Sequence, residues 1–134
     1  MHANAGVGVM KTLFFGMTAA VLTGCSKGET NDDREWQQYV SQYAESYCDL
    51  RAQCDINFAA EFGDEDQCKK SVLTNENKSR ECRMQNGCEF DPDEASFCLS
   101  AAADISCQEW LDGVLDEKCS DTWSCSGAYQ PCAE

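Results

Sequence analysis

Apolar side chains recur three or four residues apart in the first half of the chain, the spacing of one face of an α-helix. The stretch DDREWQQYVSQYAESYCDLRAQC, residues 32–54, opens with Asp32 as the predicted N-cap and Glu35 at the capping-box position. Such a face could serve as a ligand platform, but it more often packs in a core, and we predict a core helix. We call this face the aromatic stripe: Trp36, Tyr39, Tyr43, Tyr47, Leu50 and Cys54.

A second helix is predicted from Asp64 as N-cap, with Gln67 at the third position, through Cys68 and Val72. The stretch TNENKSREC that follows, residues 74–82, has no apolar side chain before its cysteine. It is either an exposed part of the same helix or a loop. The Asn-Gly pair at 86–87 then predicts a turn.

Two further helices follow the turn. Asp91 as N-cap and Pro92 at the first helical position, with Glu94 two residues later, form the clearest helix start in the chain. Ser106 with Glu109 predicts the start of a fourth helix. The predicted apolar face of the third helix is Cys98, Leu99, Ala102 and Ile105, and the predicted face of the fourth is Cys107, Leu111, Val114, Leu115 and Lys118.

The C-terminal stretch SDTWSCSGAYQPCAE, residues 120–134, is rich in turn-forming residues and carries Cys125 and Cys132. No segment alternates with period two over the length of a strand. The sequence therefore predicts an all-α fold: a small disulfide-stapled bundle of about four short helices with a turn-rich C-terminal tail.

The first 24 residues have the pattern of an export signal. A basic side chain, Lys11, precedes the apolar stretch LFFGMTAAVL, residues 13–22. Ten residues are too few to span a bilayer, which needs about 20, but suit a signal-peptide core. Met10-Lys11 is a more usual beginning for such a signal than Met1. Met1 and Met10 are therefore both candidate start sites for translation.

The residues Leu22-Thr23-Gly24-Cys25 resemble the bacterial lipobox. The resemblance implies that Cys25 receives a diacylglyceryl group, that the chain is cut just before it, and that the new N-terminus is acylated. The alternative is ordinary secretory cleavage, with Cys25 in a disulfide. Ser26, rather than Asp, after the lipidated cysteine implies attachment to the outer membrane, on either face. The chain thus divides into a lipoprotein signal peptide (1–24), a lipidated cysteine with a polar tether (25–33) and a cysteine-rich helical domain (34–134).

Disulfides are predicted to offset a thin apolar core. Only 14 of the 110 residues from 25 to 134 are Leu, Ile, Val or Phe, and cross-links restrict the unfolded chain. Eleven cysteines less Cys25 leave an even number for pairing. We therefore predict five disulfides among Cys48, Cys54, Cys68, Cys82, Cys88, Cys98, Cys107, Cys119, Cys125 and Cys132.

Their connectivity is restricted only in part. A C-x5-C step within a helix spans about 9 Å, whereas a disulfide needs Cα atoms within about 7 Å. Cys48 and Cys54 therefore cannot join each other. A helical hairpin would let Cys54 reach Cys68 across the turn, and the remaining pairing stays open.

The lipobox, the C-x5-C at the end of an aromatic helix and the block FDPDEASFCLSAAADISC (90–107) together carry a resemblance. The chain is similar to small cysteine-rich helical lipoproteins that predatory and myxobacterial-type bacteria carry in many copies. The likeness covers most of residues 25–120. It implies no established activity and supplies no functional residues.

Candidate chemistry is sparse. The only histidine, His2, lies in the predicted signal peptide, which excludes Ser-His and Cys-His catalysis and histidine-based zinc sites in the mature chain. The cysteines lack the C-x2-4-C pairs of four-cysteine zinc sites and the C-x-x-C of thioredoxin-like proteins. They also lack the adjacent Cys-Cys and the Cys-x-Cys of eight-cysteine lipid carriers.

The acidic stretches GDEDQC and FDPDE do not fit a calcium-binding loop and lie where helix N-termini favour acids. A carboxylate pair for glycoside hydrolysis stays open; no cofactor or metal is predicted.

The net charge of the chain limits the classes of molecule that it can bind. Ten Lys and Arg against 24 Asp and Glu give a net charge of −14, which repels nucleic acid. We predict a membrane-anchored cell-envelope lipoprotein that is not an enzyme and acts as an interaction or structural module. Its partners are the membrane, through the lipid on Cys25, and a basic protein or envelope component. The alternative is a tethered small-ligand-binding or enzyme-inhibitor domain, which a sizeable apolar pocket under the aromatic stripe would favour.

Overall fold

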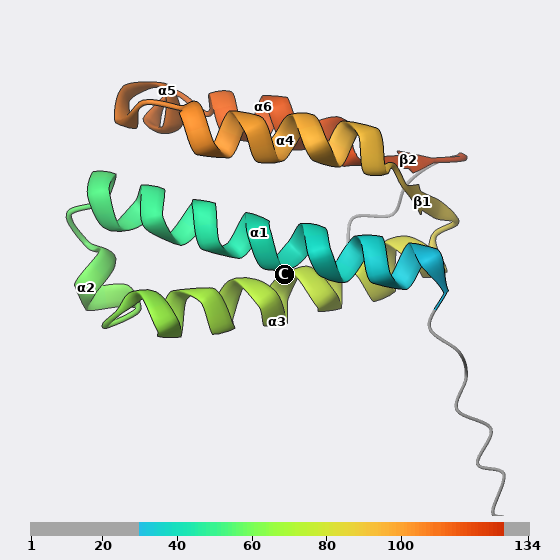
Figure 1. Ribbon diagram of the computed structural model, residues 1–134, viewed down its shortest axis with the longest axis horizontal. Helices are drawn as coiled ribbons and strands as arrows, with labels where there is room; N and C mark the ends of the chain where they lie inside the picture. The colour runs from blue at the N-terminus through green and yellow to red at the C-terminus, as the bar shows by residue number, and fades with distance from the viewer. Residues whose placement is uncertain (1–29, 128–134) are drawn as a thin grey trace, which may run out of the picture.

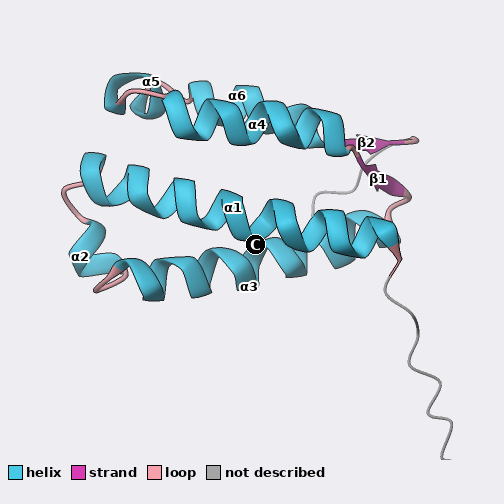
Figure 2. Ribbon diagram, in the orientation of Figure 1, coloured by secondary structure: helices cyan, strands magenta, loops and turns pink. Residues whose placement is uncertain are grey.

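The computed structural model describes residues 30–127, and predictions that concern Cys25, Cys132 or the signal peptide lie outside this range. Within it, helices dominate and two short strands form the one sheet (Figure 2). The predicted small, helical, disulfide-bonded architecture is confirmed, with six α-helices in the described residues where about four were expected. The elements are α1 (Asn31–Cys54), α2 (Phe58–Glu61), α3 (Glu65–Gln85), β1 (Cys88–Phe90), α4 (Pro92–Asp104), α5 (Cys107–Leu111), α6 (Val114–Cys119), the 3-10 helix η1 (Ser120–Thr122) and β2 (Trp123–Cys125).

Helix α1 is the central element of the bundle. It lies between α3 on one side and the layer of α4, α5 and α6 on the other (Figure 1). Three clusters of buried side chains lie along α1, and each of them includes residues of α1. The core of the bundle is therefore built around this helix. The clusters are Trp36, Tyr39, Val40, Ala95 and Cys98; Cys48, Phe58 and Cys68; and Leu50, Ala102 and Leu115.

The start of α1 differs from the prediction. Thr30, not Asp32, is the N-cap: its hydroxyl accepts from the Asp33 backbone N–H at 3.2 Å, and the Asp33 carboxylate accepts from the Thr30 backbone N–H at 3.3 Å. A hydrogen bond from Arg80 of α3, with those from Thr30, lowers the pKa of Asp33 to about 2. The predicted tether therefore ends by Thr30, because residues 31–33 form the first turn of α1.

The aromatic stripe packs into the core as predicted, most completely at its first residue. Trp36 is fully buried, and its indole N–H donates to Asn77 Oδ1 on α3 at 3.0 Å. Its ring meets the rings of Phe90 and Trp123 at centroid distances of 5.3 Å each. One side chain thus joins α1, α3 and the sheet.

Replacement of this side chain is expected to be costly. Trp36→Ala should lower the free energy of unfolding by about 3–5 kcal/mol, because it leaves a cavity in the aromatic cluster. Trp36→Phe is the matched control: it keeps most of the ring but leaves the Asn77 oxygen without its donor, a loss of about 1–3 kcal/mol. Urea unfolding with the disulfides intact measures both, and an alanine variant as stable as the parent would contradict the packing described.

Helix α3 settles the alternative that the sequence left open. Asp64 caps it, accepting from the Gln67 backbone N–H at 2.8 Å, as predicted. The polar stretch 74–82 is helical throughout. This stretch contacts α1 through polar side chains: Asn77 accepts a hydrogen bond from Trp36, and Arg80 forms an ion pair with Asp33. A search for apolar periodicity could not reveal such contacts.

The C-terminal half confirms two helix starts and corrects one helix. Asp91 accepts from two backbone N–H groups at the start of α4, and Ser106 and Glu109 form a capping box. The predicted fourth helix is divided, however, into α5 and α6. Gly113 lies between them with φ +80°, a left-handed conformation that ends the helix. Leu111, predicted on the buried face, is 66% exposed as a result.

A small sheet was not predicted. Strands β1 and β2 pair antiparallel, with Cys88 opposite Cys125 and Phe90 opposite Trp123. Three residues per strand are too few to show an alternating pattern. In residues 30–127 no helix is both long enough and apolar enough to cross a bilayer.

Candidate functional site

Four disulfides are described, and each joins two different elements. Cys82 is also disulfide-bonded. Participation of these nine cysteines in disulfides is therefore confirmed, while Cys25 and Cys132 lie outside the described residues. The four pairs are Cys48–Cys68, Cys54–Cys107, Cys88–Cys125 and Cys98–Cys119.

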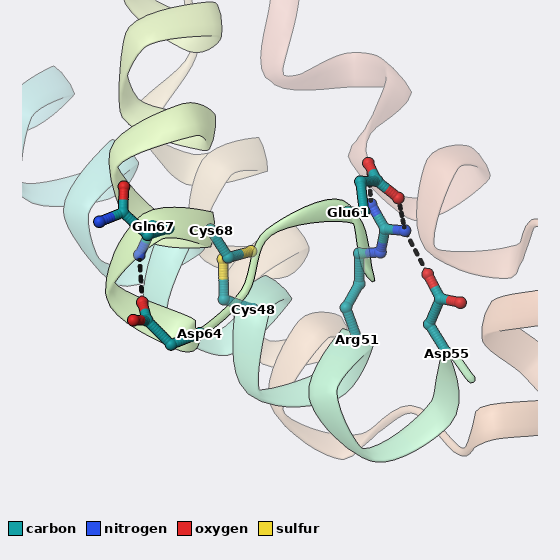
Figure 3. Close-up of a disulfide and its surroundings, with 7 residues drawn as sticks. All are labelled: Cys48, Arg51, Asp55, Glu61, Asp64, Gln67 and Cys68. Atoms are coloured by element: carbon teal, nitrogen blue, oxygen red, sulfur yellow. Dashed lines mark hydrogen bonds and ion pairs between the residues drawn. A yellow bond between two sulfur atoms is a disulfide. The ribbon is translucent and has the colours of Figure 1, made fainter. Parts of the chain in front are cut away.

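The pairing of the first two cysteines follows from the helical hairpin. Cys48 and Cys54 do not join each other, as predicted, but the predicted Cys54–Cys68 bridge is wrong. Helix α3 returns along α1 after the short α2, which brings Cys68 in its first turn level with Cys48 (Figure 3). Cys54, at the last residue of α1, instead reaches Cys107 at the start of α5.

The partly buried guanidinium of Arg51 lies at the same end of the bundle. Arg51 donates to Glu61 at 2.7 and 3.2 Å and also to Asp55 (Figure 3). Its guanidinium lies 4.8 Å from the centroid of the Phe62 ring. The hydrogen bonds to Glu61 and Asp55 raise the pKa of Arg51, and the bond from Arg51 lowers the pKa of Asp55. These acids therefore fasten the turn between α1 and α3.

The acidic stretches of the sequence act as helix caps. Asp64 and Asp91 accept backbone hydrogen bonds at the starts of α3 and α4, as predicted. Within residues 30–127, no three His, Cys, Asp or Glu side chains lie close enough to hold a metal ion.

The described surface has a groove of about 580 Å³, which we call the polar groove. Helix α1 contributes Tyr39 and Tyr43, the facing side of α3 contributes Glu76 and Arg83, and Asp116 comes from α6. Further lining residues are Ser79, Cys119, Ser120, Thr122, Trp123 and Cys125. Trp36, Tyr39 and Leu50 of the aromatic stripe are thus core residues, and Tyr39 also borders the groove together with the less buried Tyr43.

The electrostatics of the polar groove centre on Glu76. Burial raises the pKa of this carboxyl group, against the opposing effect of Arg83. Within the described part of the chain, no hydrogen bond or ion pair reaches the Glu76 carboxylate. The groove therefore holds a partly buried acid that no group of the described protein neutralises by contact.

The two tyrosines remain neutral at physiological pH. Burial raises the pKa of Tyr39 to about 12, and its hydroxyl lies 3.4 Å from Cys98 Sγ. Burial also raises the pKa of Tyr43, and the negative charges of Glu76 and Asp116 act in the same direction. The two acids, one on α3 and one on α6, thus influence the same phenol.

Sequence reasoning did not single out Glu76, Arg83 or Asp116. The spacing of Glu76, Ser79 and Arg83 places them on one face of α3, but a helix this polar gives no sign of which face meets a groove. The only signal was the aromatic stripe, whose middle residues supply two of the lining side chains.

Fold and cross-links together define the class: a small, helical, disulfide-rich protein. Four or more disulfides are typical of proteins that fold in an oxidising, extracytoplasmic compartment. Neither a protein-family model nor a curated protein or solved structure matches this chain.

Proposed function

We propose that the protein is a lipid-anchored lipoprotein of a bacterial cell envelope, that it is not an enzyme, and that it acts as an interaction module for basic partners. Acyl chains on Cys25 hold it at the outer membrane, and the residues before Thr30 tether the helical domain. The likeness to small cysteine-rich helical lipoproteins of predatory and myxobacterial-type bacteria supports this assignment. So does the cross-linked helical architecture itself.

The observation that carries the proposal is unneutralised acidic charge on a cross-linked scaffold. Residues 30–127 contain 22 Asp and Glu side chains against eight Lys and Arg. The ion pairs described within this range use only Arg51 and Arg80, which contact Asp55, Glu61 and Asp33. Most carboxylates therefore face solvent without an internal counter-ion. A surface of this kind attracts basic proteins and repels nucleic acid.

Crosslinking in intact cells, followed by binding measurements on each retrieved protein, tests the proposal. A genuine partner should be basic, and its affinity should fall roughly tenfold or more between 0.05 and 0.5 M salt, since screening shortens electrostatic attraction to about 8 Å near 0.15 M. A neutral protein of similar size is the control. Affinity that does not change with salt would contradict the proposal. So would turnover of a hydrolase or thiol-oxidoreductase substrate that vanishes when one named carboxylate becomes an amide.

A second function is favoured by one observation, the polar groove. A hollow of about 580 Å³ with an aromatic lining is of a size that binds small molecules. A tethered small-ligand-binding domain is therefore the second candidate. Its lining, which includes two acids, one guanidinium and three hydroxyl-bearing Ser and Thr side chains, is unlike the apolar pocket expected for a lipid or other apolar ligand.

A further inference from the structure

We propose that the polar groove binds a primary alkylammonium group, with Glu76 and Asp116 on either side of the cation and Tyr39 and Tyr43 against its methylene chain. The inference rests on the proposed function and specifies the place and the chemistry of the contact. The alkylammonium group comes from a lysine side chain of a basic partner or from a free polyamine.

The two carboxylates of the polar groove favour a cationic ligand. The two carboxylates come from different elements, Glu76 from α3 and Asp116 from α6, and the charge of each raises the pKa of the Tyr43 phenol. Within residues 30–127 neither carboxylate makes a hydrogen bond or ion pair. The single guanidinium of the groove, Arg83, lies 5.5 Å from the centroid of the Trp123 ring and is held there by a cation–π contact. The charge of Arg83 lowers the pKa of Glu76, but Arg83 makes no ion pair with either acid, so both carboxylates lack a counter-ion in contact.

The aromatic lining of the groove favours a ligand that carries an alkyl chain next to its ammonium group. Tyr39 and Tyr43 lie with nearly parallel rings, 5.8 Å between centroids and 23° between planes. Both phenols stay neutral and add no negative charge, and because Tyr39 is only 7% exposed, most of the accessible ring surface is that of Tyr43. Lysine-type chains commonly lay their methylene groups along such apolar surface while the ammonium group reaches a carboxylate.

Other ligand classes fit less well. An anion would have Arg83 alone to oppose two acids. A divalent metal ion prefers several carboxylate or carbonyl oxygens around one point, and no cluster of three His, Cys, Asp or Glu occurs among residues 30–127. An apolar ligand would leave the partly buried Glu76 carboxylate without a partner.

Binding should depend on pH through the acids. Burial raises the pKa of Glu76 in the free protein, and a bound cation favours its charged form, so affinity should fall as pH drops through that pKa. The other groups that face Glu76 are Arg83 on its own helix, Tyr39 and Tyr43 on α1, and Asp116 on α6. A variant without both acids should therefore show no pH dependence from the groove.

Titration calorimetry and NMR titration of the intact protein test the inference, with spermidine and an Nα-acetyl-lysine amide as probes. The double variant Glu76→Gln/Asp116→Asn should bind at least roughly tenfold more weakly than the parent, because two charge-assisted contacts are lost. The matched control is Glu81→Gln/Glu117→Gln. It removes two exposed acids from the same two helices, outside the groove, and should stay within about twofold of the parent. Unchanged circular dichroism confirms that each variant is folded.

The remaining outcomes separate this inference from the proposed function. An equal loss in both double variants, with salt-sensitive binding of a basic partner preserved, would overturn the groove inference alone. Absence of salt-sensitive binding to any basic protein would overturn the proposed function as well. Arg83→Gln should tighten binding of either probe several-fold, because it removes a like charge from the groove, whereas weaker binding would contradict the charge argument. Glu76-dependent binding of the lysine amide supports a partner side chain, and such binding of spermidine alone supports a free polyamine.

Discussion

Reduction of the disulfides in the absence of denaturant is expected to remove most of the helical circular dichroism. In the chain-entropy relation, Cys54–Cys107, with a sequence separation of 53, stabilises the fold by roughly 4 kcal/mol, and Cys48–Cys68, with a separation of 20, by roughly 3 kcal/mol. Small domains have total stabilities of about 5–15 kcal/mol. Loss of all the bridges together should therefore exceed what the remaining core supplies.

The buried side chains explain why the remaining core is weak. Among the largest fully buried side chains of the described range, half are cysteines: Cys48, Cys68 and Cys98 stand beside Trp36, Val40 and Leu115. The bridges thus occupy positions that larger apolar side chains fill in other domains. Removing the bonds takes away the cross-links and leaves small thiols in their place.

Two measurements check this prediction. Intact mass after alkylation of the unreduced protein should show five bridges and no free thiol among the ten cysteines of residues 34–134. Far-ultraviolet circular dichroism should then fall on addition of reductant. A variant lacking one bridge, Cys48→Ala/Cys68→Ala, is the control: it should keep its helices and lose about 3 kcal/mol of unfolding free energy. Full helicity in reductant would mean that the apolar core is sufficient by itself.

The second large effect concerns the anchor. Cys25→Ser is expected to release the protein from membranes and to abolish fatty-acid labelling, because serine cannot form the thioether that carries the diacylglyceryl group. Each buried CH₂ of an acyl chain contributes about 0.8 kcal/mol to membrane binding, and more than one chain is needed for firm attachment. Cell fractionation and incorporation of labelled fatty acid measure the outcome.

A neighbouring substitution serves as the control for the anchor. Ser26→Ala leaves the cysteine and the residues before it unchanged, so that variant should remain in the membrane fraction. If the Cys25→Ser protein still incorporates label or still sediments with membranes, the lipobox interpretation fails. Cys25 would then be a candidate for a disulfide, as an ordinary secretory signal implies.

Helix starts could be predicted because their signals are local. Asp64, Asp91 and Ser106 each accept a backbone hydrogen bond two or three residues away, so the residues involved stand together in the sequence. The first cap failed because Thr30 and Asp32 are both good cap residues, and Arg80 from α3 holds Asp33, which favours the earlier one. That contact spans 47 residues and leaves no local pattern.

The disulfide pairing and the composition of the polar groove depend on where the helices end and how they pack, which the sequence does not show directly. Nearness in sequence suggests that a short hairpin lets Cys54 reach Cys68. The intervening α2 and the return of α3 along α1 moved the contact back to Cys48. Likewise, the polar groove combines side chains from α1, α3 and α6, and only the α1 members belonged to a visible stripe. Tertiary packing, rather than residue type, brings Glu76 and Asp116 together.

The order of the bridges along the chain has a consequence for a protein exposed to secreted proteases. The loops closed by Cys48–Cys68, Cys54–Cys107 and Cys88–Cys125 overlap one after the other and leave no gap between residues 48 and 125. A single backbone cut anywhere in that span, including the exposed turn at Ile56, therefore leaves both fragments covalently joined. Such a nick adds one water to the mass and becomes visible as two bands only after reduction. Degradation of the domain thus requires several cuts or prior opening of a bridge.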